Sequence, residues 1–169
     1  MMTTELKTES TRMSSIVVLY DMHTKFLHKA VEGISNKDAN ERLNTKANHV
    51  AWLVGSIVQE RVEMARQLGA KNVKSQVAEQ LFKDHQGIQD GVTYPPVVDF
   101  MRDWDNISPV LREAYVNADE QKLESRYEMP GMDMSYYDMV TFTTYREANI
   151  IGQIALWRRL LGYEGMKYM

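Results

Sequence analysis

Four histidines are the side chains of this sequence best suited to hold a metal or to move a proton near neutral pH. A zinc or nickel site needs several histidines or carboxylates that converge. His23 and His28 are five residues apart and would face different sides of a helix, whereas His28 and Glu32 have a spacing that a metal could bridge. A solvated hydrogen-bonded pair is the simpler interpretation. His85 has no partner nearby, and for His49, at the start of an apolar segment, a helix-end role is favoured over a catalytic one.

A second group of polar side chains lies within an apolar stretch near the end of the sequence. Residues 145–162 read YREANIIGQIALWRRLLG, which is typical of a packed helix ending at a glycine, yet Arg146, Glu147 and Asn149 stand in its first turns. A guanidinium at such a place could bind a carboxylate or phosphate through two hydrogen bonds. The sequence has no Cys and no nucleophile-elbow, P-loop or dinucleotide-binding motif. We therefore expect no thiol or nucleotide chemistry and no cofactor.

The composition predicts one ordinary globular domain. A chain of 169 residues with 44% hydrophobic residues can bury a core without disulfides or metals. The net charge of −3, without a basic cluster, argues against a nucleic-acid partner. No apolar run is long enough to cross a membrane, so a cytoplasmic protein is expected, with a flexible segment over residues 1–10 and a single domain over residues 11–169.

Apolar residues recur at helical spacing along most of the chain, which predicts an all-α fold. We expect four long helices over about residues 11–33, 45–69, 97–117 and 135–162, with Asn44 or Thr45 capping the second and Pro109 kinking or interrupting the third. Ser135 and Asp138 resemble a capping box for the fourth helix. The connection over residues 70–94 contains only a short amphipathic piece near 77–82, and residues 118–134 read as an irregular loop. The long connection favours a four-helix bundle with one crossover, between the second and third helices.

Two of these segments resemble a known family. REANIIGQIALWRRLLG is similar to the last-helix signature of the DinB-like superfamily, H-E-x-x-H-x-G-Q-I-x-x-x-R-R-x-L-G. HVAWLVGSIVQERVEMARQLG resembles the family's x-x-x-W-x-x-G-H-I helix at Trp52, Gly55 and Ile57, and the helix spacing agrees over nearly the whole chain. The resemblance implies a four-helix bundle with up-down-down-up order. It also implies a divalent metal held by three histidines, in a pocket that some members use for thiol transfer or hydrolysis.

The residues that the resemblance assigns to the metal are different here. Ser56 stands in place of the histidine of the second helix, and Arg146 and Ile150 replace the two histidines of the last helix. Arginine stays protonated and isoleucine has no lone pair, so neither can ligate a cation. Glu147 is retained but points about 100° around the helix from Arg146. We therefore predict a member of this class that has lost its metal site.

Two hypotheses for the vacated pocket stay open. In the first, Arg146 and the Ser56 hydroxyl bind a small anion between aromatic walls, with His49 as a titratable neighbour. In the second, Arg146 pairs with an acidic side chain or with carbonyls of a neighbouring helix, which is the more frequent fate of a buried charge. The candidate ligand-binding residues are Ser56, Arg146, His49, Trp52, Asn149 and Trp104.

Two alternatives to a binding protein follow from the same sequence. Ile154, Trp157 and Leu161 continue the packed face of the last helix, while tyrosines and methionines near it leave apolar material for a homodimer surface. A homodimer without a ligand is one alternative. A metal-independent transferase or hydrolase of the DinB-like class is the other, although the sequence offers it no nucleophile motif.

Overall fold

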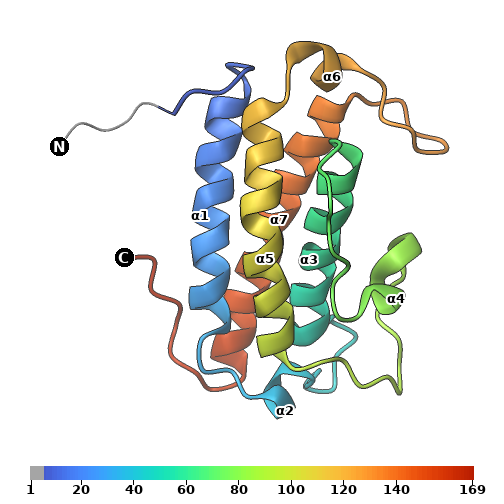
Figure 1. Ribbon diagram of the computed structural model, residues 1–169. Helices are drawn as coiled ribbons and strands as arrows, with labels where there is room; N and C mark the ends of the chain where they lie inside the picture. Colours follow the sequence, from blue (N-terminus) through green and yellow to red (C-terminus); the bar gives the residue numbers. More distant parts are fainter. Residues whose placement is uncertain (1–5) are drawn as a thin grey trace.

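The computed structural model describes residues 6–169, and these residues form helices and connecting segments without a β-strand. The all-α class is confirmed. Four long helices lie side by side: α1 (Met13–Val31), α3 (Val50–Gln67), α5 (Val97–Asn117) and α7 (Tyr136–Leu160) (Figure 1). Both α1 and α3 pack against α5 and α7.

The connections set the directions of these helices. In Figure 1, α1 and α7 run downward, whereas α3 and α5 run upward. A long segment leaves the top of α3 and descends through α4 (Glu79–Phe82) and the 3-10 turn η1 (Lys83–His85) before α5 begins. The other two short helices, α2 (Asn36–Ala39) and α6 (Glu120–Glu124), lie in connections at opposite ends of the long helices.

The start of α3 differs from the prediction. Asn44 or Thr45 was the expected cap, but the helix begins at Val50 and His49 is its N-cap. Residues 40–48 instead form a turn in which the Arg42 guanidinium donates to the carbonyls of Lys46, at 2.7 Å, and Ala47, at 2.9 Å. These bonds satisfy carbonyl groups outside a helix, so the polar segment does not need to join α3.

The structure bears on three further predictions about the helices. A kink or an interruption was expected at Pro109, and the interruption is wrong: α5 continues through this residue, with Trp104 and Leu111 buried on either side of it. Apolar packing on both flanks offsets the hydrogen bond that proline cannot donate. Residues 118–134 were expected to form an irregular loop, but they contain the short helix α6. The capping box of Ser135 and Asp138 at the start of α7 is confirmed.

A buried polar layer divides the core into two apolar clusters. One cluster includes Leu27, Val54, Phe100 and Ile154, and the other includes Val17, Val62, Leu111 and Val140. Between them lie buried polar side chains of all four long helices, His23, Arg61, Ser108 and Glu147.

The N-terminal residues outside the helices also make contacts, since the amide of Glu9 donates to the carbonyl of Val116. Residues 1–5 of the segment expected to be flexible lie outside the described residues. None of the described helices is long and apolar enough to span a membrane.

Candidate functional site

A cavity of about 400 Å³ lies between α3 and α7. Two irregular segments border it: the turn after α4, around His85 and Gly87, and the segment from Tyr127 to Met132. Polar and apolar side chains share its lining. The polar ones are Ser56, Gln59, Glu60, Glu63, Gln67, His85, Gln86, Thr143 and Arg146; the large apolar ones are Trp52, Met64, Phe82, Tyr127, Met129, Met132, Met139 and Phe142.

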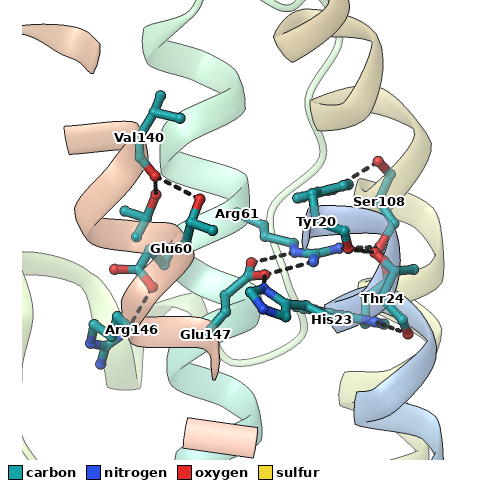
Figure 2. A network of polar contacts seen from close by, with 12 residues as sticks. Tyr20, His23, Thr24, Glu60, Arg61, Ser108, Val140, Arg146 and Glu147 are labelled. Carbon is teal, nitrogen blue, oxygen red and sulfur yellow. Dashed lines mark hydrogen bonds and ion pairs between the residues drawn. The ribbon is translucent and has the colours of Figure 1, made fainter. Parts of the chain in front are cut away.

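Arg146 reaches into this cavity from α7 and forms an ion pair with Glu60 of α3 (Figure 2). Its Nη1 lies 2.9 Å from Oε2 of Glu60, and its Nη2 lies 3.5 Å from Oγ of Ser56. The two charged side chains are only 29% and 18% exposed. Burial raises the pKa of Glu60 to about 7, although the neighbouring Arg146 works in the opposite direction. The internal pair that the sequence analysis considered is therefore present, with Glu60 as the negative partner.

The three positions that correspond to metal ligands in the resemblance do not form a donor set. Ser56 donates its hydroxyl proton to the carbonyl of Leu53 at 2.9 Å, one turn earlier on α3. Ile150 is buried in the apolar core. Among residues 6–169, no three His, Cys, Asp or Glu side chains converge in a way that could hold a metal ion. The hydroxyl of Ser56 is committed to a backbone carbonyl rather than to a base, so the cavity offers no activated serine.

Of the other candidate residues, only Trp52 lines the cavity. His49 caps α3, with its Nδ1 accepting from the amide of Trp52 at 3.1 Å, and its ring packs edge-on against Tyr94. Burial lowers the pKa of His49 to about 4. Trp104 lies inside the core, and Asn149 is exposed and accepts a hydrogen bond from Gln153. The structure therefore brings Trp52, Ser56 and Arg146 together in the cavity. The other three candidates, His49, Trp104 and Asn149, lie outside it.

Trp104 belongs instead to the buried polar layer. Its ring covers one face of the Arg61 guanidinium at 3.4 Å, and the ring of Tyr20 lies 3.8 Å from the same group. Arg61 donates to both oxygens of Glu147, at 2.6 and 2.8 Å, and His23 lies 3.2 Å from Oε2 of that carboxylate (Figure 2). Burial alone would raise the pKa of Glu147, but Arg61 and His23 hold it below its ordinary value. These groups do not line the cavity between α3 and α7, and their mutual hydrogen bonds fit a structural role.

Glu60, Glu63 and His85 line the cavity but were not predicted to do so. Spacing along α3 could have found the first, because Trp52, Ser56 and Glu60 follow one another at four-residue steps and share a helix face. Glu63 and Gln67 continue that face. His85 offered no such signal, since its place depends on a turn in which Asp84 and His85 both adopt positive φ angles, of 57° and 56°.

Comparison with known proteins adds no assignment: no family model matches this sequence, and no curated protein matches it.

Proposed function

We propose that this chain is a DinB-like four-helix bundle protein that has lost the metal site of its class and binds a small organic molecule in the cavity between α3 and α7. The observation that carries the proposal is the position of Ser56 and Arg146. These residues occupy two of the places that the resemblance gives to metal ligands, and both line the same cavity, beside Trp52. The directions of α1, α3, α5 and α7 support the up-down-down-up order.

The composition of the cavity supports a ligand with an apolar body and a polar group. Aromatic rings and methionines occupy much of its lining, while charged groups gather on neighbouring turns of α3 and α7. Methionine side chains adapt to different apolar shapes, which suits a site for small molecules. An anion held by Arg146 is one form of this proposal, and it requires the ligand to displace Glu60 from the guanidinium.

A ligand screen on two glycine variants tests the proposal. Gly87 lines the cavity, and a Cβ atom added there would meet no atom within 4 Å. Gly87→Trp should therefore obstruct the cavity without disturbing the core. Gly165→Trp is the matched control, because Gly165 also has open space and lies outside this cavity.

We expect ligand-detected NMR on a library of small amphipathic molecules to find compounds that bind the wild type and Gly165→Trp but not Gly87→Trp. Compounds that bind all three proteins equally would place the binding elsewhere. An empty screen would also count against the proposal. The proposal also states that the metal site is lost. Metal analysis of protein purified without chelators tests this part, since a stoichiometric transition metal would contradict it.

A homodimer is the second candidate, and one observation favours it. Four large apolar side chains of α7 are more than half exposed: Phe142, Tyr145, Leu156 and Leu160. The exposed positions of α7 between Asp138 and Arg159 carry no charge, which is the composition of a helix face that can pack on a second copy. Light scattering coupled to size-exclusion chromatography should give twice the monomer mass, and a monomer at high concentration would remove this candidate.

A further inference from the structure

The charges that line the cavity do not balance. Glu60 and Glu63 of α3 and Arg146 of α7 are its Asp, Glu, Lys and Arg side chains. Arg146 is paired with Glu60, at 2.9 Å. Among the described residues, Glu63 has no basic group within ion-pair distance. The cavity therefore has one carboxylate more than the fold itself neutralises.

Neutral amides hold this second carboxylate in place. Nε2 of Gln59 donates to Oε1 of Glu63 at 2.9 Å, and Nε2 of Gln76 donates to Oε1 of Gln59 at 2.9 Å. Gln59 and Gln76 are both buried, with 3% and 5% of their surfaces exposed. The chain of amides orients Glu63 through one oxygen and leaves its charge without a counterion.

A third acceptor lies on the same face of α3. Gln67 lines the cavity, and its Oε1 is buried without a hydrogen-bond partner among the described residues. Glu60, Glu63 and Gln67 are three and four residues apart, so their side chains form one row along the helix. A buried carbonyl oxygen without a partner is costly, and a donor from a ligand would relieve that cost.

The remaining lining suits the apolar part of a cation. The rings of Trp52 and Phe82 lie 6.2 Å apart, and Tyr127 and Phe142 contribute two more aromatic rings. Aromatic faces attract ammonium groups, and this attraction grows when the site excludes water. A row of acceptors in the same cavity as aromatic and methionine side chains therefore matches an amine on an apolar body better than it matches an acid.

We propose that the cavity between α3 and α7 binds an organic cation, a primary ammonium on an aromatic or alkyl body. The ammonium group donates its three protons to Glu60, Glu63 and Gln67, and the body lies against the aromatic and methionine side chains. This inference rests on the proposed small-molecule function and names its ligand class. A carboxylate would face two like charges and would reach Arg146 only by displacing Glu60.

Three compounds with one apolar body test this inference: 3-phenylpropylamine, 3-phenylpropanol and 3-phenylpropanoate. Isothermal titration calorimetry on the full chain at pH 7.5 should show that the amine binds at least about tenfold more tightly than the alcohol, and the acid more weakly than both. Glu63→Gln should reduce the preference for the amine to about twofold or less and leave the affinity for the alcohol unchanged. Glu113→Gln, an exposed carboxylate on α5, is the matched control and should keep the preference.

Each other result has a distinct meaning. Equal binding of the three compounds, or tighter binding of the acid, would overturn the cation assignment and leave the small-molecule function standing. A preference for the amine that survives Glu63→Gln would remove Glu63 from the site and overturn the assignment. Failure of all three compounds to bind would overturn the ligand class, and the library screen on the wild type and Gly87→Trp then decides separately whether the small-molecule function stands.

Discussion

Arg61 and Glu147 form a buried two-bond ion pair between α3 and α7, while their sequence neighbours Glu60 and Arg146 pair on the cavity side of the same two helices (Figure 2). Adjacent residues on a helix point about 100° apart. In each of the two pairs of neighbours, Glu60–Arg61 and Arg146–Glu147, one charged side chain therefore points into the core and the other toward the cavity. The two pairs have opposite polarity: the cation comes from α3 in the inner pair and from α7 in the outer pair. One interface therefore carries both a structural ion pair and a candidate binding site.

Removal of the inner carboxylate should strongly destabilise the protein. Glu147→Gln leaves the Arg61 guanidinium, 1% exposed, without its anion. We expect the free energy of unfolding to fall by about 3–5 kcal/mol, as for other broken buried pairs. Asp21→Asn is the control, because Asp21 pairs with Arg112 where the two side chains are 37% and 40% exposed, and its loss should cost less than about 1 kcal/mol. Urea denaturation measures both values, and equal losses would refute the structural role given to the inner pair.

His49 should make the protein sensitive to mild acid. Burial lowers its pKa to about 4, below the ordinary value of 6.5. The unfolded chain therefore takes up this proton first, so the stabilising contribution is complete above pH 6.5 and is lost as the pH falls toward 4, by about 3 kcal/mol in all. His49→Asn keeps an acceptor for the helix cap but does not titrate. Between pH 7 and 4, the wild type should lose more stability than this variant, and parallel curves would contradict the low pKa.

Two glycines in the long helices should respond in opposite ways to alanine. A methyl group at Gly55 would lie 2.6 Å from Cε2 of Phe82 and 3.0 Å from the ring of Phe100, whereas one at Gly152 would meet nothing within 4 Å. Gly55→Ala should destabilise the protein by about 1–3 kcal/mol through overpacking. Gly152→Ala should stabilise it by about 0.5–1 kcal/mol, because alanine is the better helix former. Thermal unfolding compares the two, and a stabilising Gly55→Ala would show that Phe82 can move away from α3.

The helical periodicity of the sequence predicted the all-α class and most helix ends correctly. Such patterns report burial along one face, and the capping box at Ser135 adds a local hydrogen-bond signal. The start of α3 was missed because the bonds from Arg42 to the carbonyls of Lys46 and Ala47 compete with helix formation. The interruption at Pro109 was wrongly predicted because tertiary packing offsets the intrinsic preference of a single residue.

The candidate site was predicted less completely. Arg146 and Ser56 were placed together because the resemblance aligned them, and the structure adds Glu60 as the partner of Arg146. Trp104 was assigned to the cavity as an aromatic wall, but its ring covers Arg61 in the core. A single helix face can be read from spacing, whereas the pairing of faces on different helices depends on their rotation and register, which local patterns do not specify.

Glu60 should titrate near neutral pH. Burial raises its pKa to about 7, and the charge of Arg146 opposes that rise, so Arg146→Met should raise the pKa of Glu60 further. Because the folded chain binds this proton more tightly than the unfolded chain, the contribution of Glu60 to stability decreases as the pH rises from about 4.5 to 7, opposite in sign to that of His49. Carbon-detected NMR of labelled glutamate side chains can follow the Glu60 carboxyl, identified by its absence in Glu60→Gln. A midpoint near 4.5 in the wild type, or one that stays unchanged in Arg146→Met, would show that the carboxylate is better solvated or less closely paired than the structure indicates.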